Sequence, residues 1–327
     1  MKALVIQNPI AGSVWRSLRF HEIEKVLKSA SIPFVLEKTC QSGDATRFAR
    51  QARQEGFSHV LVFGGDGTFR EAAQALAGSD VILVPIPSGT ANLLAHELGL
   101  RTDLKTLPEL LKKGRVKQID LGKADGLFLK GAESPHYFIL MAGIGMDAVA
   151  VRGVDSRLKR WMGWILYIVS GFWNVARHRS FRTTLHFIDP PLDPVTLDAW
   201  VIVVGNARAY GIRGIRVASH AEIDDGLLDI CVFQSRNMWH FIKHFFMVLA
   251  GKHLEDEDVL YFKAKSLRIE TETKTPVQLD GDLFGETPIT LSVDSRCLNI
   301  LVPPEAGEST QLDLSLKQSF RNSVEIT

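Results

Sequence analysis

Apolar residues in the first third of the chain form short runs that alternate with segments of helical periodicity. The short runs predict four buried strands, at 3–8, 34–39, 59–64 and 81–86. In the segments between and after them, apolar residues recur every three or four positions, which predicts helices at 20–30, 43–56, 68–77 and 90–99. This alternation indicates a parallel sheet with helices on both faces.

The pattern changes after about residue 120, where strand-like runs are broken by Gly, Pro, Asp and Asn. The runs lie at 136–143, 180–189, 198–206, 215–221, 227–234, 266–273, 275–282 and 288–295. Helical stretches are expected only at 156–177 and 238–252. Many strands and few helices predict an antiparallel sandwich or barrel. The predicted fold class is an α/β N-terminal domain with a parallel sheet, followed by a C-terminal β-rich antiparallel sandwich.

The length of 327 residues, about twice that of a typical domain, agrees with two domains. We place the first at 1–120 and the second at 121–302. The segment 303–320 is expected to return to the first domain, and the polar end of the chain is expected to be partly disordered.

The composition narrows the choice of partners. Hydrophobic residues make up 46% of the chain, charged residues 23%, and the formal net charge is +1. Such a balance gives no reason to expect a nucleic acid partner. The cysteines, Cys40, Cys231 and Cys297, form no CxxC pair, which argues against a zinc site and against a disulfide framework. We therefore expect a reducing, cytoplasmic location.

The most apolar window, at 161–176, has 16 residues, fewer than the roughly 20 that a helix needs to span a bilayer. It is expected to be either a buried helix between the domains or a helix that lies in the membrane interface. Transient peripheral contact with the inner membrane surface is therefore an expected interaction. A homodimer is left open.

Residues 64–68, Gly-Gly-Asp-Gly-Thr, follow the third predicted strand and open a helix. In such a sheet, ligands bind where strand ends lead into helix N-termini. Glycines let backbone N–H groups approach a ligand, and the helix dipole favours an anion. The carboxylate of Asp66 makes sense if Mg²⁺ joins it to phosphates. The alternative is a tight turn with an aspartate helix cap.

Three other strand-end loops have similar chemistry, at 8–12, 38–45 and 88–92. All are rich in amide, hydroxyl or glycine groups, and four such loops at one edge of a sheet are hard to explain as turns alone. They predict a cradle for a polyphosphate. The domain at 1–120 is therefore expected to bind a nucleotide, and the domain at 121–302 its co-substrate.

The motif GGDGT followed by P-x-GTxN resembles the diacylglycerol kinase catalytic domain, which soluble bacterial lipid kinases share with sphingosine and ceramide kinases. The likeness extends over nearly the whole chain and includes the segments 8–12, 119–126, 142–148, 206–230 and 279–282. GGDGT also occurs in NAD kinases and phosphofructokinase-like proteins, but the later motifs separate this chain from them.

The resemblance implies that the protein uses ATP and Mg²⁺. Residues 64–68 would wrap the ATP phosphates, with Asp66 meeting their Mg²⁺, and Asn8 and Asn92 would orient groups in the same cleft. The implied nucleotide contacts are Asn8, Thr39, Gly64, Gly65, Asp66, Gly67, Thr68, Thr90 and Asn92.

The resemblance also implies a catalytic base, because a carboxylate must take the proton of the acceptor hydroxyl. In the family this base is the glutamate of an L-D-G-E motif, whereas here Asp282 ends the sequence Leu-Asp-Gly-Asp. Its side chain is one methylene shorter, which moves the oxygens by about 1.5 Å. We expect the loop to compensate. Asp120 is the second carboxylate implied, as part of a network that joins the base to the Mg²⁺ site.

Asp224, Asp225 and Gly226 predict a tight acidic turn, and carboxylates with backbone carbonyls are what a hard cation prefers. The resemblance implies a structural Mg²⁺ there, bound by the Asp225 side chain and by carbonyls near Glu222 and Leu227. A solvated turn is the alternative.

Many diacylglycerol kinases have an aspartate where this chain has Leu93, which weakens the case for diacylglycerol as the acceptor. The sequence therefore predicts an ATP- and Mg²⁺-dependent kinase of a diacylglycerol-like or other long-chain lipid. The alternatives are a kinase of a soluble alcohol or of NAD, and a non-catalytic regulator that binds lipid or nucleotide.

Overall fold

The computed structural model describes residues 2–11, 20–29, 31–100, 104–128, 136–145, 180–234 and 238–304. The helix expected at 156–177, with its apolar window, lies outside these residues. So does all but the first two residues of the segment expected at 303–320.

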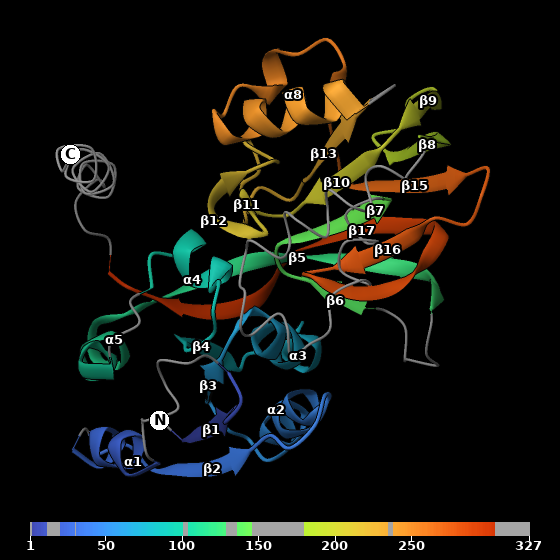
Figure 1. The fold of residues 1–327 in the computed structure, drawn as a ribbon. Coiled ribbons are helices and arrows are strands. Elements are labelled where there is room, and N and C mark those ends of the chain that lie inside the picture. The colour runs from blue at the N-terminus through green and yellow to red at the C-terminus, as the bar shows by residue number, and fades with distance from the viewer. Residues whose placement is uncertain are drawn as a thin grey trace, which may run out of the picture.

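The N-terminal part is a parallel sheet covered by helices (Figure 1). Its strands are β1 (Ala3–Gln7), β2 (Phe34–Lys38), β3 (His59–Gly64) and β4 (Ile82–Pro87), in the order β2–β1–β3–β4. The helices are α1 (Phe20–Ser29), α2 (Asp44–Gln54), α3 (Asp66–Leu76), α4 (Leu93–Glu97) and α5 (Leu107–Lys113), preceded by a 3₁₀ turn at Leu104–Thr106.

Residues of β1 and β3 alternate between two apolar cores, which explains why both faces of the sheet are covered. Val5 and Leu61 pack with Leu27 of α1 in one core. Ile6 and Val62 pack with α2 and α3 in the other. Successive side chains of a strand point to opposite faces, so an uninterrupted apolar strand needs helices on both sides. The α/β fold predicted from the sequence is confirmed.

The strand register brings four loops to one edge of the sheet. Gln7 at the end of β1 pairs with Lys38 of β2 and Phe63 of β3, and Gly64 pairs with Pro87 of β4. The loops that follow these strands therefore open side by side, as the sequence predicts for parallel strands.

Two helices begin at other residues than the sequence suggests. Helix α3 begins at Asp66, so Asp66, Gly67 and Thr68 form its first turn and only Gly65 remains as an extended N-cap residue (φ −106°, ψ −174°). An aspartate in a first helical turn is favourable because it faces the positive end of the dipole. Helix α4 begins at Leu93, after Asn92 in the left-handed region (φ 50°, ψ 47°).

The C-terminal part is β-rich, with one described helix, α8 (Met238–Leu249), and a 3₁₀ turn at His253–Glu255. Its strands are β5 (Arg115–Phe128), β6 (His136–Phe138), β7 (Met141–Gly145), β8 (Phe181–Asp189), β9 (Val195–Ala199), β10 (Val201–Gly205), β11 (Ala209–Tyr210), β12 (Ile212–Arg216), β13 (Leu228–Phe233), β14 (Val259–Ala264), β15 (Ser266–Thr271), β16 (Pro276–Leu279) and β17 (Asp282–Val302).

Nine of these strands form two antiparallel branches that meet at β17, β5 pairs with β17 and β6, and β11 and β12 form a separate two-stranded sheet. One branch runs β14–β13–β10–β7–β16–β17, and the other runs β9–β8–β15–β17. Leu185 and Leu267 of the second branch share a core with Ile202 and Ile230 of the first. This arrangement is the predicted antiparallel sandwich. The predicted strand at 215–221 is wrong in its position, since β12 ends at Arg216 and a bend follows.

The long strands β5 and β17 connect the two parts, and the sequence pattern did not reveal their length. They pair antiparallel from Gly285 with Phe128 to Val302 with Arg115, interrupted by two register shifts. The end of β17 also pairs in parallel with β4, where Ile300 lies opposite Leu83. Figure 1 shows β17 running from beside β16 in the β-rich part to the α/β part.

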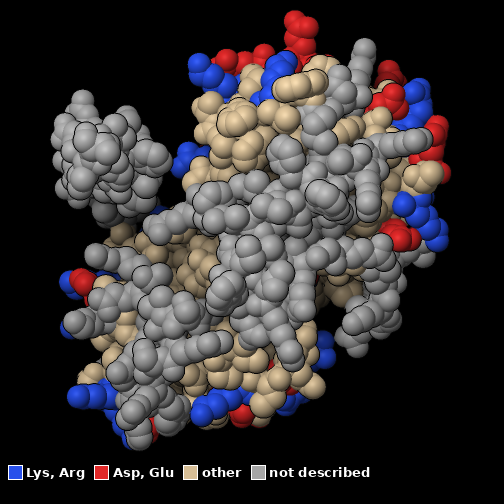
Figure 2. Space-filling view, viewed as in Figure 1, with Lys and Arg blue, Asp and Glu red and all other residues tan. Residues whose placement is uncertain are grey.

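Acidic and basic side chains are intermixed over the described residues of the face in Figure 2, in agreement with the balanced net charge. None of the helices in the described ranges is long and apolar enough to cross a bilayer.

We predict that Gly89→Ala destabilises the fold by about 2 kcal/mol, because a methyl group there would lie 2.7 Å from Cα of Gly65. Gly67→Ala is the matched control, since the nearest atom to its methyl group would be an Asp282 carboxylate oxygen at 4.0 Å. Urea denaturation of both variants measures the difference. Equal stability of the two variants would contradict the proposed close contact of the two loops.

Candidate functional site

The two glycine loops at the ends of β3 and β4 pack directly against each other. A methyl group on Gly65 would lie 3.2 Å from Cα of Gly89, and the amide of Ser88 donates a hydrogen bond of 2.8 Å to the carbonyl of Gly64. Gly64 is also tight, because a methyl group there would lie 2.6 Å from Cβ of Thr68. These glycines are therefore required for the contact between the loops, whatever else they bind.

Asn8 connects the first strand-end loop to this pair. Its Nδ2 donates a hydrogen bond of 3.0 Å to Oγ1 of Thr68, and its Oδ1 accepts one of 3.0 Å from the amide of Ile10. Thr68 is buried at 7% exposure. The side chain of Asn8 thus fixes its own loop against the first turn of α3.

Asp66 caps helix α4. Its two carboxylate oxygens accept hydrogen bonds from the amides of Leu93 (3.1 Å) and Leu94 (3.0 Å). Burial raises the pKa of Asp66, and these amides oppose that rise. The alternative that Asp66 is a helix cap is therefore correct in part, but the helix that it caps is α4, not α3. In this way Asp66 holds the second glycine loop to the first.

Three of the four remaining predicted nucleotide contacts lie on the same edge with different local roles, and Gly67 is described below with Asp282. Asn92 closes its own loop, accepting from the amide of Gly89 (2.8 Å) and donating to its carbonyl (2.9 Å). Thr39 is buried at the end of β2, and its amide donates to the carbonyl of Gln7 (2.9 Å). Thr90 is exposed in the loop that follows β4.

The Leu-Asp-Gly-Asp sequence forms the tight turn between β16 and β17. Asp280 and Gly281 both have positive φ (47° and 85°), as a two-residue type I′ hairpin requires. The buried carboxylate of Asp280 accepts three hydrogen bonds of 2.7 to 3.0 Å from the consecutive amides of residues 139–141. Burial raises the pKa of Asp280, and the charge of Arg70 opposes this rise. Asp280 therefore anchors the turn that presents Asp282.

Asp282 projects from this anchored turn toward the GGDGT helix. Its side chain is 60% exposed, and its Oδ2 accepts a hydrogen bond of 2.6 Å from Nη2 of Arg70 on α3. The same oxygen lies 4.0 Å from where a Cβ at Gly67 would be. The structure thus brings together two segments that are far apart in the sequence, the first turns of α3 and the start of β17.

Asp120 lies on β5 and is fully buried, and its carboxylate accepts hydrogen bonds from two backbone amides. Its Oδ1 accepts from the amide of Arg296 (2.6 Å), and its Oδ2 accepts from the amide of Gly226 (2.7 Å). Burial raises its pKa. Its contacts therefore connect β5 to the 224–226 turn and to a bulge in β17, and its expected link to the base Asp282 stays a prediction.

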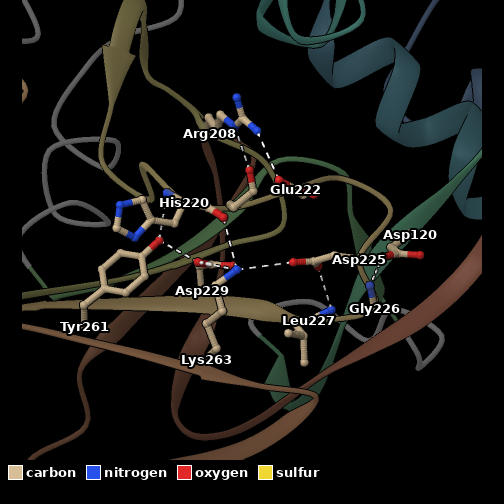
Figure 3. A network of polar contacts seen from close by, with 11 residues as sticks. Asp120, Arg208, His220, Glu222, Asp225, Gly226, Leu227, Asp229, Tyr261 and Lys263 are labelled. Atoms are coloured by element: carbon tan, nitrogen blue, oxygen red, sulfur yellow. Dashed lines mark hydrogen bonds and ion pairs between the residues drawn. The ribbon is translucent and has the colours of Figure 1, made fainter.

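The turn expected to hold a structural Mg²⁺ contains an ammonium group (Figure 3). The Nζ of Lys263 on β14 lies 3.3 Å from Oδ2 of Asp225, 3.4 Å from Oδ1 of Asp229 and 3.1 Å from the carbonyl oxygen of His220. Burial alone would lower the pKa of Lys263, but Asp229 and Asp225 raise it above its ordinary value. The side chain is therefore a cation.

Other polar groups of this turn also have partners. Oδ1 of Asp225 accepts from the amide of Leu227 (3.0 Å), and the carboxylate of Glu222 lies 3.6 Å from Arg208. The carbonyl of Glu222 accepts from the amide of Asp225 (3.4 Å). With Lys263 among them, the residues present do not fit a divalent cation.

Two family models together match most of the chain. Residues 2–124 match the model described as "Diacylglycerol kinase catalytic domain", and residues 141–302 match "YegS C-terminal NAD kinase beta sandwich-like domain". A diacylglycerol kinase of Mycobacterium tuberculosis strain H37Rv is 30% identical over 305 residues, which cover 92% of this chain and 95% of that protein. The chain belongs to the diacylglycerol kinase family. The resemblance drawn from its motifs is confirmed.

Other relatives agree with this assignment over nearly full length. A diacylglycerol kinase of Bacillus subtilis strain 168 is 27% identical over 316 residues, with 95% of this chain and 99% of that protein covered. The crystal structure of a candidate diacylglycerol kinase from Bacillus anthracis strain Sterne superposes with a TM-score of 0.75 at 29% identity. It covers 93% of this chain and 95% of that chain, which confirms the two-part fold.

Three residues that the sequence did not single out are in contact with residues of the recognised motifs or anchor them. Arg70 pairs with Asp282, Asp280 anchors the turn, and Lys263 enters the 222–229 turn. Arg70 and Asp280 lie within or directly beside motifs already recognised, so their charge was a usable signal. Lys263 has no such signal, because only the pairing of β13 with β14 brings it near Asp225 and Asp229.

We predict that Asp280→Asn lowers the free energy of unfolding by about 3 kcal/mol, because an amide nitrogen or a single carbonyl would then face three donors. The matched control is Asp282→Asn, two residues away on an exposed side chain, with an expected change below about 1 kcal/mol. Chemical denaturation measures both. If Asp282→Asn were as unstable as Asp280→Asn, the assignment of Asp280 as the anchor of the turn and of Asp282 as an exposed carboxylate would be wrong.

Proposed function

We propose that this chain is an ATP-dependent lipid kinase that takes Mg²⁺ with its nucleotide and phosphorylates the hydroxyl of a diacylglycerol-like or other long-chain lipid. Membership of the diacylglycerol kinase family supports the reaction class. The observation that carries the proposal is the position of Asp282, whose Oδ2 borders Gly67 at the N-terminus of α3. A nucleophile activated at Asp282 would meet a phosphate held at that helix terminus.

In the proposed reaction, the γ-phosphoryl group of ATP lies against the first turn of α3, where the positive end of the helix dipole favours an anion. The acceptor hydroxyl oxygen attacks the γ-phosphorus, and its proton passes to the Asp282 carboxylate. The bond between the γ-phosphorus and the β–γ bridging oxygen breaks, and ADP leaves. Positioning and charge neutralisation are the main requirements of this step.

The donor set at the loops fits a magnesium ion that arrives with ATP. Asp66 is the carboxylate of the two glycine loops, and the residue of α4 whose amide it accepts from is Leu93 rather than a second acid. Mg²⁺ is commonly bound by one or two carboxylates together with phosphate oxygens and water. Asp66 would hold the ion, which neutralises phosphate charge when bound.

Arg70 supports the proposed use of an aspartate as base. Asp282 is one methylene shorter than the glutamate of the family motif, and the bond of 2.6 Å from Arg70 fixes its carboxylate beside α3. A guanidinium group that holds one carboxylate oxygen leaves the other for the proton. We therefore assign Arg70 as a positioning residue. This contact comes from α3, whereas the sequence led us to expect that the loop itself compensates for the shorter side chain.

A lipid acceptor also implies contact with a membrane, so we propose transient peripheral binding during turnover, and a homodimer is not required by the proposed reaction. The candidate docking segment at 161–176 lies outside the described residues. Balanced charge on the described face gives no support to a nucleic acid partner.

The proposal predicts that a total lipid extract in mixed micelles gains label from γ-labelled ATP when Mg²⁺ is present. Asp66→Ala should abolish the labelling because the variant loses both the proposed ion contact and the link to α4. Circular dichroism controls for loss of fold. ATP binding without labelled lipid, under the same conditions, would instead support a soluble acceptor or a regulatory protein.

A second prediction concerns Arg70. Arg70→Met should lower kcat by about tenfold with little change in KM for ATP, because the carboxylate of Asp282 loses its fixed position. Arg268→Met, which breaks an exposed pair with Glu270 on β15, is the matched control and should leave kcat unchanged. Steady-state kinetics on the labelled lipid measures both. An unchanged kcat in Arg70→Met would show that Arg70 does not position the carboxylate of Asp282 for catalysis.

A further inference from the structure

We infer that the ammonium of Lys263 takes the place of a divalent cation at the 222–229 turn, so that the turn is stable without bound metal. The inference does not depend on the proposed function. It rests on the geometry around Nζ, on the charges near it and on the strands that bring these residues together (Figure 3).

The acceptors around Nζ match the capacity of an ammonium group. Lysine has three N–H donors and no acceptor. Three oxygens lie within 3.4 Å, from the Asp225 carboxylate, the Asp229 carboxylate and the His220 carbonyl. These are the ligand types of a hard cation, but Mg²⁺ requires about 2.1 Å and octahedral geometry. Distances of 3.1 to 3.4 Å suit a lysine.

The charges at the turn are paired without a metal. Asp225 and Asp229 share Lys263, whereas Asp224 lies 3.0 Å from Nζ of Lys117. Glu222 lies 3.6 Å from Arg208. Each carboxylate of residues 222–229 therefore lies within reach of a basic side chain, although Asp225 and Asp229 share one ammonium group.

Asp229 gives the site a structural reason to hold a cation. It is fully buried on β13, its Oδ1 accepts a hydrogen bond of 2.6 Å from the hydroxyl of Tyr261, and its Oδ2 has no hydrogen-bond partner among the described residues. Burial raises the pKa of Asp229, and a nearby positive charge opposes that rise and favours the ionised carboxylate. Lys263 supplies that charge from the neighbouring strand, two residues from Tyr261.

The position of Lys263 is fixed by strand register. Lys263 lies directly opposite Asp229 in the antiparallel pair of β13 and β14, and Asp225 lies in the turn that leads into β13. Opposite charges at such a cross-strand position attract each other. The ammonium therefore reaches the turn through regular sheet pairing.

The test is thermal unfolding without nucleotide, in excess EDTA and in excess MgCl₂. The Tm of the wild-type protein should be the same in both. Lys263→Met keeps most of the side-chain length but removes the charge, so its Tm in EDTA should fall by about 5 °C. Mg²⁺ should restore part of this loss, because the freed oxygens would then bind the ion. Lys265→Met is the matched control, since Lys265 lies 4.0 Å from an exposed Asp189.

Terbium luminescence gives a second readout. Tb³⁺ prefers oxygen ligands and would be sensitised by Tyr261, so Lys263→Met should gain a luminescence signal that the additional change Asp225→Asn removes. A wild-type Tm that rises with Mg²⁺, and no longer rises in Asp225→Asn, would overturn the inference. So would a Lys263→Met variant that behaves like Lys265→Met, or one whose lost stability Mg²⁺ does not restore. If Lys263→Met does not fold, the wild-type comparison still decides.

Discussion

The antiparallel pairing of β5 with β17 is the constraint on which the rest of this structure depends. One end of β17 lies against β4 of the parallel sheet, where Ile300 pairs with Leu83, and the other end begins at Asp282 in the β-rich part. The long pairing with β5 fixes the distance between these ends. A residue near the C-terminus of the described chain is thereby held beside the first turn of α3.

The carboxylates of the recognised motifs divide into two groups by their surroundings. Asp66, Asp120 and Asp280 accept hydrogen bonds from two or three backbone amides and hold loops together. Asp282 is exposed and bonded to the side chain of Arg70. The oxygens of the first three carboxylates are already bonded to backbone amides, whereas the exposed carboxylate of Asp282 is accessible to an acceptor hydroxyl. This division explains why only one of the several acidic residues in the motifs is our candidate for the catalytic base.

The sequence predicted the parallel sheet and its four loops because both follow from local periodicity and strand order. It did not predict the length of β5 and β17, since their polar edges and bulges at residues such as Asp294 break the alternating pattern. Contacts such as those of Arg70 with Asp282 and Lys263 with Asp229 depend on tertiary pairing between distant segments. The metal expected at Asp225 was implied by the family resemblance and agreed with the ligand chemistry, and that chemistry does not separate Mg²⁺ from an ammonium group.

The most direct test of the account is a single-turnover measurement of phosphoryl transfer from ATP to lipid by wild-type protein and by Asp282→Ala. If Asp282 takes the proton at the junction of the two parts, the transfer rate should fall by about 10³-fold, while calorimetry finds ATP affinity within about twofold of the wild type. A transfer rate that survives the substitution, or one that is lost in proportion to ATP affinity, would contradict the assignment of the base and of the junction as the site.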